Sequence, residues 1–259
     1  MEMKDMIVEY HKMRPSQIVK RRTELPVAYM GVGTIEWHGL HNPIGPDGLK
    51  ANGIACYLAK RLGGIVMPTQ YWGDNRKEIA ELEFDPKVNP WIPPQIDDHT
   101  LVIAELMQLD KNKFLKDAER CTQLGGWRLW IELMVRTLFQ IETLGFEKVV
   151  IIPGHYPLFT PLQNAIAKYK EDGGACKVLM LTDQMYSDDG KSGDHAAMFE
   201  TSLMMALYPE LVDINELGSD LNKIPVGVLG DDPRVYASKE FGFQVLKKFE
   251  EIVSNFIKS

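Results

Sequence analysis

The sequence predicts an α/β fold with a mostly parallel sheet and helices on both of its faces. Short apolar segments that end near glycine or proline alternate with longer segments whose apolar residues recur at helical spacing. Buried parallel strands have this uninterrupted apolar character, and the helices that connect them cover the sheet. The length of 259 residues suffices for one large domain or two small ones.

The amino-terminal part of the chain contains the first strand–helix–strand unit. We expect the first strand at residues 25–33, which are mainly apolar and end at glycine. A helix is expected at 48–62, because apolar residues recur every four positions and two glycines follow. The second strand is expected at 64–69. This order favours a parallel pair joined by a helical crossover.

The same alternation returns in the middle of the chain. A helix is expected at 127–144, where an apolar stripe ends at a glycine. The third strand is expected at 148–153, a helix at 161–172 and the fourth strand at 177–182. Each strand is short and bounded by polar or glycine-containing segments. These elements extend the predicted parallel sheet.

Two further helices are expected at 198–207, before a proline, and at 241–257, which has an amphipathic pattern. Residues 74–126 interrupt the alternation and are rich in proline. We interpret them as a divergent insertion that forms a lid, a pocket wall or a subunit contact, not as a separate domain. The chain is then a single domain over 1–259.

Composition and charge limit the classes of function and partner that we expect for this protein. A net charge of −7 argues against non-specific binding to nucleic acid. The three cysteines show no CxxC pairing, which favours a reducing compartment. No signal peptide is apparent, and no apolar run approaches the roughly 20 residues that cross a bilayer. We therefore expect a cytoplasmic protein that acts on a small molecule, with no membrane or nucleic-acid partner.

The loop at residues 33–47 concentrates metal-binding side chains. Glu36 and His38 are two residues apart, so in an extended chain they point to the same side. Proline and glycine residues then favour a turn that returns Asp47 to the same point. His41 lies close enough to belong to the same site. Carboxylates and imidazoles at this density suit divalent cations, and one carboxylate can bridge two of them, which suggests a hydrolytic centre with one or two metal ions.

Further polar residues follow the other predicted strands. His155 comes two residues after the third strand and Asp183 directly after the fourth. Because the carboxyl ends of parallel strands meet at one edge of a sheet, a site shared with Glu36 is expected there. His155 taken alone fits a metal ligand and a loop histidine bonded to the backbone equally well.

His195 and Glu200 flank the start of the helix expected at 198–207. On spacing alone the structural interpretation is favoured, with Asp194 as a helix cap and Glu200 as a first-turn charge. The functional interpretation makes His195 a proton donor and Glu200 a carboxylate that binds or orients a metal. The sequence contains no P-loop, no G-x-S-x-G turn and no H-E-x-x-H helix, which disfavours nucleotide binding, serine hydrolysis and zincin-type proteolysis.

Four segments in order resemble motifs of the creatininase (creatinine amidohydrolase) family. They are residues 33–47, 145–156, 195–212 and 227–238, and the matches extend from about 25 to 243 apart from the insertion. The resemblance implies a three-layer α/β/α, creatininase-like fold. It also implies a binuclear site for divalent ions (zinc, manganese or iron) and a homo-oligomer, often a hexamer.

The resemblance also assigns roles to individual residues. Glu36 and His155 would hold one metal ion, His38 would hold the other, and Asp47 would bridge them. His195 would match the histidine that transfers protons.

One position departs from the family pattern. Pro157 stands where creatininase has a glutamate that binds the second metal ion, which argues against creatinine itself as the substrate. Glu200 is our candidate for the missing carboxylate and, with His195, for a catalytic role. His41, Tyr156 and Asp183 are expected in the substrate pocket.

We therefore expect a metal-dependent hydrolase that opens a small cyclic amide or a related C–N bond through a metal-activated water, with His195 protonating the leaving group. The first alternative is a ring-opening C–C hydrolase of a cyclic polyol-derived ketone of the inosose type, in carbohydrate or inositol catabolism. The second is a family member that binds metal or ligand without catalysis. Retention of all the expected ligands argues against the second alternative.

Overall fold

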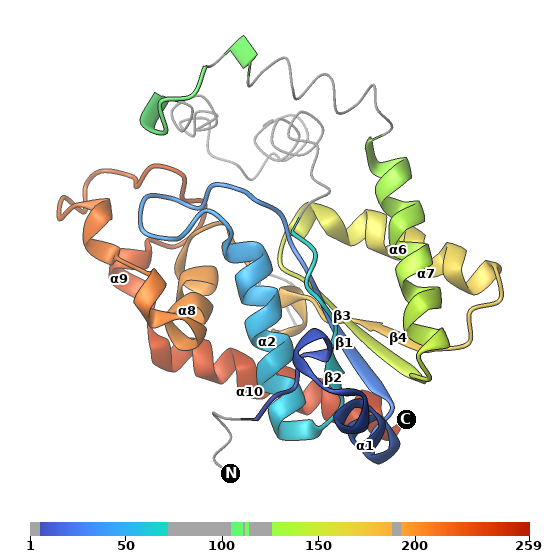
Figure 1. Cartoon of the computed structure of the whole chain (residues 1–259). Helices are drawn as coiled ribbons and strands as arrows, with labels where there is room; N and C mark the ends of the chain where they lie inside the picture. Colours follow the sequence, from blue (N-terminus) through green and yellow to red (C-terminus); the bar gives the residue numbers. More distant parts are fainter. Residues whose placement is uncertain (1–5, 72–104, 111, 114–125, 188–192) are drawn as a thin grey trace.

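The computed structural model describes residues 6–71, 105–110, 112–113, 126–187 and 193–259. Within them lies a 4-stranded sheet of order β2-β1-β3-β4 in which every neighbouring pair is parallel (Figure 1). The strands are β1 (Val27–Val32), β2 (Ile65–Val66), β3 (Lys148–Pro153) and β4 (Lys177–Met180). The described sheet is therefore parallel throughout, as predicted.

The two middle strands form the centre of the molecule. β1 and β3 pair along their whole length, from Val27 opposite Lys148 to Val32 opposite Pro153. Every residue of β1 is buried. A strand that is covered on both faces has to be apolar on both, which explains the uninterrupted apolar runs in the sequence.

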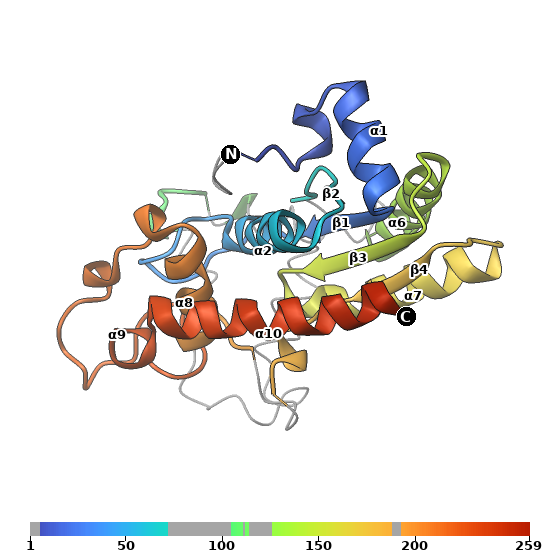
Figure 2. The ribbon, with the colours of Figure 1, turned by 90° about the horizontal axis from the view of Figure 1, so that it is seen from below.

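One face of the sheet is covered by α2 (Pro46–Leu62), α8 (Met198–Leu207) and α10 (Lys239–Lys258). Tyr29 of β1 and Ile152 of β3 point into this layer. Figure 2 shows α10 as a long helix that runs beside α8 across this side of the molecule. These helices bring the start of α8 close to the carboxyl ends of the central strands.

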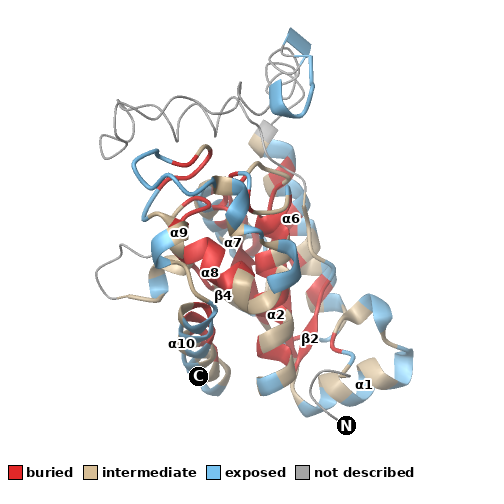
Figure 3. Cartoon of the chain, turned by 90° about the vertical axis from the view of Figure 1, so that its left-hand side faces the viewer, coloured by how far each residue is buried: buried red, intermediate tan, exposed pale blue. Residues whose placement is uncertain are grey.

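The opposite face is covered by α6 (Gly126–Thr143) and α7 (Phe159–Glu171). Met30 of β1 and Ile151 of β3 point into this second layer, because successive side chains of a strand alternate between faces. Figure 3 shows buried residues concentrated on the strands and on the helix surfaces that face them. The three-layer α/β/α arrangement is thus confirmed.

Short elements complete the described fold. They are η2 (Tyr10–Lys12), α1 (Pro15–Glu24), η3 (Tyr156–Leu158), η4 (Asp183–Met185), η5 (Pro209–Leu211), η6 (Ile214–Leu217) and α9 (Pro233–Tyr236). α1 is not predicted from the sequence, because none of its residues is fully buried and its contact with the core, through the partly buried Ile18, is small. Polar contacts also hold it: Arg21 donates a hydrogen bond to the Gly64 oxygen, and Gln17 accepts one from the Arg14 nitrogen at the start of the helix.

The predicted ends of strands and helices agree best with the structure where the apolar pattern is strongest. β3 and α8 begin and end at the predicted residues. β2 is shorter than predicted, because one extra residue interrupts its pairing with β1: Met67 N donates to the Tyr29 oxygen, but the next donor, to the Gly31 oxygen, is Gln70 N. Pairing returns only as an isolated bridge between Gln70 and Val32.

The predicted insertion at about 74–126 lies mostly outside the described residues. The alternation of strands and helices resumes with α6, which lies within one residue of the helix expected at 127–144. Of the helices that are described, none has both the length and the apolar character needed to cross a bilayer.

Candidate metal centre

Carboxylate and imidazole side chains converge beyond the carboxyl ends of β1 and β3. Two of them come from the loop after β1, one from the start of α2, one from the turn after β3, and two from the segment that opens α8. In that order they are Glu36, His38, Asp47, His155, His195 and Glu200. All but Glu36 are buried. The fold therefore brings together every sequence-predicted metal ligand.

Asp47 lies in the first turn of α2, directly against the ends of both central strands. Two glycines permit this approach. A Cβ atom on Gly154 would lie 2.0 Å from the Asp47 carbonyl oxygen, and one on Gly33 would lie 2.3 Å from the Gly48 nitrogen. Thr34 Oγ1 donates a hydrogen bond to Asp47 Oδ2 at 2.6 Å. The first turn of a helix also favours a negative charge. Backbone packing therefore fixes the carboxylate at the centre of the site.

The first group of donors consists of Glu36, Asp47 and His155. His155 Nδ1 lies 2.8 Å from Glu36 Oε2 and 3.3 Å from Asp47 Oδ2. Glu36 Oε2 is nevertheless buried without a hydrogen-bond partner among the described residues. Buried polar atoms that converge in this way require a partner, and a cation is the partner that carboxylate and imidazole lone pairs can share.

The second group consists of His38, Asp47 and Glu200. His38 Nε2 lies 3.0 Å from Asp47 Oδ1 and 3.4 Å from Glu200 Oε2. With Nδ1 as the protonated nitrogen, His38 donates to the backbone oxygen of Glu36 at 3.2 Å, which turns Nε2 toward the carboxylates. Asp47 belongs to both groups and approaches each histidine through a different oxygen.

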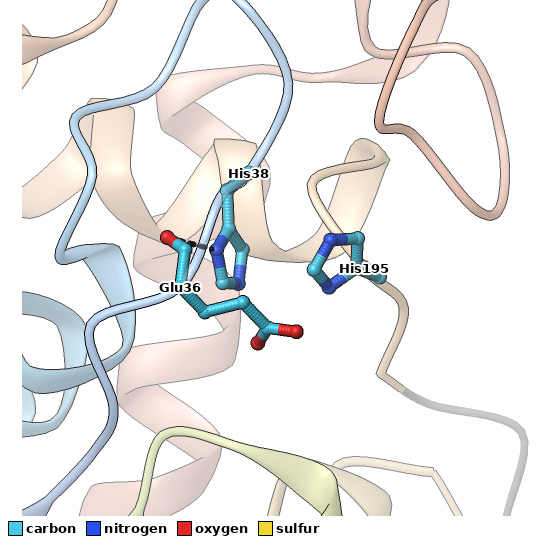
Figure 4. A group of neighbouring side chains, drawn as sticks. All are labelled: Glu36, His38 and His195. Carbon is cyan, nitrogen blue, oxygen red and sulfur yellow. Dashed lines mark hydrogen bonds between the residues drawn. The ribbon is translucent and has the colours of Figure 1, made fainter. Parts of the chain in front are cut away.

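A third group joins Glu36, His38 and His195. The rings of His38 and His195 have centroids 4.3 Å apart. Figure 4 shows the Glu36 carboxylate directed into the space beside the two imidazoles. The backbone of His195 pairs with Leu229, with N···O distances of 3.0 and 2.8 Å, so the histidine is held in place from outside the cluster.

Burial disfavours charge throughout the cluster, and the neighbouring groups decide the protonation states. Burial lowers the pKa of His38, but the charges of Asp47 and Glu200 outweigh it and raise that pKa well above the usual value. Burial also lowers the pKa of His155, and Glu36 and Asp47 again raise it well above the usual value. In the protein without metal, both imidazoles therefore carry protons that a bound cation would replace.

The carboxylates are also in the state that a metal requires. Burial raises the pKa of Glu36 and of Asp47, but the histidines beside them outweigh it and lower both pKa values. Both groups are thus ionised at neutral pH. Mixed carboxylate and imidazole donors suit zinc, manganese and iron. The residues present therefore fit divalent metal ions.

Lys50 also belongs to this site, although the sequence motifs do not include it. Its side chain is 1% exposed, and Nζ donates hydrogen bonds to Glu200 Oε1 and, at 3.2 Å, to Asp183 Oδ2. A signal was present in the sequence. Lys50 lies four residues before Ile54 and eight before Leu58, so it occupies the core-facing stripe of α2. A lysine in that stripe needs a charged partner, because an unpaired buried ammonium is costly.

The three predicted pocket residues have different environments. His41 is buried, its Nε2 lies 2.9 Å from Thr201 Oγ1, and burial is the main cause that lowers the pKa of the imidazole to about 4. Tyr156 is 60% exposed in η3. Asp183 forms its ion pair with the buried lysine. Their proposed contact with a substrate remains a prediction.

Comparison with known proteins places the carboxyl-terminal half of the chain in a family. Residues 126–250 match the sequence model of the Creatininase family, described as creatinine amidohydrolase. Creatinine amidohydrolase of Pseudomonas putida is 24% identical over 196 residues, which cover 74% of this chain and 68% of that protein. Residues 126–250 of this chain are therefore similar to the creatininase family. The resemblance found in the four sequence motifs is confirmed.

Solved structures share the fold over nearly the whole chain. Creatinine amidohydrolase (creatininase) has 18% sequence identity and a TM-score of 0.65, with 97% of this chain and 96% of that chain covered. A manganese structure of creatininase has 20% identity and a TM-score of 0.65, with 98% of both chains covered. A mutant creatininase of the Zn-Zn type has 18% identity and a TM-score of 0.66, also with 98% of both covered. At these identities the likeness establishes the fold.

The matched relatives are creatinine amidohydrolases, which are metal-dependent hydrolases. The solved relatives include manganese and Zn-Zn forms. The described residues of this chain contain three groups of candidate metal ligands, and the predicted divalent metal ions fit these groups. The role of each individual ligand stays a prediction.

Proposed function

We propose that this chain is a hydrolase that opens a small cyclic amide or a related C–N bond with a metal-activated water. One observation carries the proposal: Asp47 serves two groups of buried donors through separate oxygens. A carboxylate in that position can bridge two cations. When bound, such ions polarise the carbonyl of a substrate and lower the pKa of a water molecule toward about 7.

The ligands divide into two sets around Asp47. Glu36 and His155 would hold one ion, and His38 and Glu200 would hold the other. The short distances from His155 to Glu36 and from His38 to Glu200 support this division. Glu200 thereby supplies, from α8, the carboxylate that the chain lacks at Pro157.

His195 is the proposed proton-transfer residue. Burial lowers the pKa of His195, and in the metal-free protein the positive charge of His38 lowers it further, so the imidazole is uncharged at neutral pH; a cation held by His38 would act in the same direction. Its ring lies against that of His38 and its ligand nitrogen lies within 4.8 Å of a Glu36 oxygen. A neutral imidazole in this position can accept the proton that the attacking water loses and deliver it to the leaving nitrogen.

The bond that is cleaved can be tested with a panel of small substrates. Protein loaded with zinc or manganese is incubated with creatinine, a hydantoin, a lactam, a formamide and a cyclic polyol-derived ketone. The proposal predicts cleavage of at least one C–N substrate other than creatinine, with no cleavage after the metal is removed. Turnover of the ketone alone would instead assign the ring-opening C–C reaction. Metal binding without any turnover would contradict catalysis of either kind.

Glu36→Gln tests the metal mechanism on whichever substrate is cleaved. The variant keeps the size of the side chain but removes the charge that faces His155. Loss of a residue that merely orients a ligand costs 10- to 100-fold, so loss of a ligand should lower kcat/KM on the order of a hundredfold or more. Glu171→Gln at the exposed end of α7 is the matched control. Activity of Glu36→Gln equal to that of the control would refute the proposed ligand role.

We also infer a cytoplasmic homo-oligomer, for which the resemblance suggests a hexamer. Cys56 and Cys176 are free thiols, which fits a reducing compartment. Leu221, Ile224 and Tyr236 expose 60%, 63% and 60% of their surface near α9, and exposed apolar side chains that gather in one region favour an interface. Light scattering of the purified chain measures the number of subunits directly, and a monomer would contradict the inference.

A further inference from the structure

Lys50, Asp183 and Glu200 form a buried charged triad at the edge of the candidate metal centre. They come from α2, η4 and α8 respectively. The side chains of Lys50 and Glu200 are 1% and 7% exposed, and that of Asp183 is 16% exposed. Water therefore does not solvate the Lys50 ammonium, and its role depends on the side chains that it contacts.

The two oxygens of Glu200 have different partners. Oε1 accepts the hydrogen bond from Lys50. Oε2 accepts one from the Ala196 nitrogen at 2.8 Å and lies 3.4 Å from His38 Nε2. The lysine and the backbone N–H thus hold the carboxylate from two sides, and its second oxygen faces His38 and Asp47.

The backbone beside Glu200 also helps to hold its carboxylate in place. Ala196 has a φ of 54°, in the left-handed region that alanine rarely adopts. This conformation is the one in which its N–H reaches Glu200 Oε2. Backbone in a sparsely populated region persists where the surroundings determine it, and such residues cluster at functional sites. The orientation of Glu200 is therefore fixed from its own segment as well as from α2.

Within the triad, Lys50 adds no net positive charge to the metal site. Lys50 and Asp183 cancel each other, so the negative charge available to cations comes from Glu36, Asp47 and Glu200. A lysine without Asp183 would repel a nearby cation and weaken its binding. With that counter-ion present, Lys50 contributes a hydrogen bond of defined direction at little net electrostatic cost to the site.

The position of Glu200 has a consequence for the second group of donors. Pro157 offers no side-chain ligand, and the carboxylate beside His38 in that group comes from α8. We propose that Lys50 is the positioning residue of the second metal site, holding Glu200 so that Oε2 faces His38 and Asp47, with Asp183 as its counter-ion. This inference rests on the proposed function, since it requires an ion in that group.

Two roles for Lys50 make opposite predictions. If the lysine acted only through its charge, Lys50→Met would remove a repulsive cation and the second metal ion would bind more tightly. If the lysine positions Glu200, the same change frees the carboxylate and the second ion binds more weakly. Residues that orient a metal ligand typically contribute about 10- to 100-fold in affinity.

A double variant separates geometry from charge. Lys50→Met/Asp183→Asn removes the hydrogen bond but leaves the net charge of the cluster unchanged, and it avoids an uncompensated buried carboxylate if Lys50→Met alone fails to fold. Metal-free protein is titrated with Co²⁺, followed by the d–d absorption spectrum and by equilibrium dialysis. Thermal unfolding and circular dichroism of the metal-free variants verify folding. Lys60→Met, on the same helix, is the matched control.

We expect wild-type protein and Lys60→Met to bind two Co²⁺ ions with the same two affinities. In the double variant, the second ion should bind about tenfold more weakly or worse, with an altered d–d spectrum, while the first keeps its affinity. Glu200→Gln should lose the second ion in the presence of Lys50. Unchanged affinity for the second ion in the double variant, or in Glu200→Gln, would overturn the inference. Wild-type protein that binds no ion would instead overturn the proposed function.

Discussion

Glu200 has two possible roles at the start of α8, and its neighbours separate them. On spacing alone, a first-turn charge that stabilises the helix is the simpler interpretation. In the structure that task belongs to Asp194, whose carboxylate accepts hydrogen bonds from the nitrogens of Phe199 at 2.6 Å and Glu200 at 3.0 Å. Glu200 itself turns toward Lys50 and His38. Its side chain is therefore available to the donor cluster.

Metal binding should release protons and weaken in acid. The pKa values of His38 and His155 are raised by their carboxylate neighbours despite burial, so both imidazoles are protonated at neutral pH without metal. A cation displaces those protons, and the apparent affinity should fall as pH falls, by about tenfold per pH unit for each proton released. Calorimetric zinc titrations in buffers of different ionisation enthalpy count the protons. An affinity that is independent of pH between 6 and 8 would contradict this assignment.

The individual residues of the site differ in how far the sequence reveals them. The proximity of Glu36, His38 and Asp47 could be predicted because they lie close together in the sequence, in the loop after β1 and the first turn of α2. Lys50 could not be paired in advance, since its partners are 133 and 150 residues away in the sequence. A buried ion pair between distant segments depends on the tertiary fold, so the local sequence pattern around either partner does not predict it.

At the scale of secondary-structure elements, the contact between the end of β3 and the start of α2 sets the site. A Cβ atom on Gly154 would lie 2.0 Å from the Asp47 carbonyl oxygen, and backbone on both sides leaves no room to adjust. Gly154→Ala should therefore push α2 away from the sheet, lower the free energy of unfolding by about 1–3 kcal/mol and weaken zinc binding. Urea unfolding and zinc titration measure the two effects.

Gly45→Ala is the control for this contact. Gly45 has a φ of −124°, and its Cβ would meet Ile35 Cδ1 at an ordinary 3.4 Å. The free energy of unfolding and the zinc affinity of Gly45→Ala should stay near those of the wild type. If Gly154→Ala also matched the wild type, the close approach of β3 and α2 would not be what fixes Asp47.

The long helix α10 should contribute through its buried stripe. Phe249 is 1% exposed in the layer that α10 forms with α2 and α8, whereas Phe243 on the same helix is 44% exposed. Phe249→Ala should lower the free energy of unfolding by about 3–5 kcal/mol, because it removes a large buried side chain and leaves a cavity. Phe243→Ala should change it by about 0.5 kcal/mol or less. Equal urea midpoints for the two variants would contradict the described packing of α10.

Elements with a strong apolar pattern were the predictable part of the fold. β3 and α8 agree with the sequence to the residue, because burial on both sides of a strand, or along a helix, leaves an unambiguous pattern. α1 has no fully buried residue and is held by the partly buried Ile18 and by polar contacts such as that of Arg21 with the Gly64 oxygen, so its helix could not be predicted from periodicity. β2 is shorter than predicted because one extra residue separates the two donors Met67 and Gln70, and a local irregularity of this kind leaves no periodic signal in the sequence.

At the scale of the whole molecule, the donor cluster exists only when the fold is complete. Its members come from four separate segments: the loop after β1, the start of α2, the turn after β3 and the segment that opens α8. The unfolded chain therefore has no preformed site, and bound metal should stabilise the native state. Free zinc at a hundred times its dissociation constant should raise the free energy of unfolding by about 2.7 kcal/mol.

Thermal unfolding with and without a chelator measures this coupling. The melting temperature should fall on chelation and return when zinc or manganese is added. Asp47→Asn, which weakens both groups of donors at once, should melt at nearly the same temperature under all three conditions. A wild-type protein that behaved like Asp47→Asn would show that the cluster holds no metal of energetic importance.

X-ray diffraction from crystals of the metal-loaded protein, recorded on both sides of the zinc absorption edge, tests the central claim most directly. We predict two anomalous peaks, each at roughly 2.0–2.2 Å from a different oxygen of Asp47. One should lie beside Glu36 and His155, the other beside His38 and Glu200. A cluster without any peak, or a single ion that does not touch Asp47, would contradict the account.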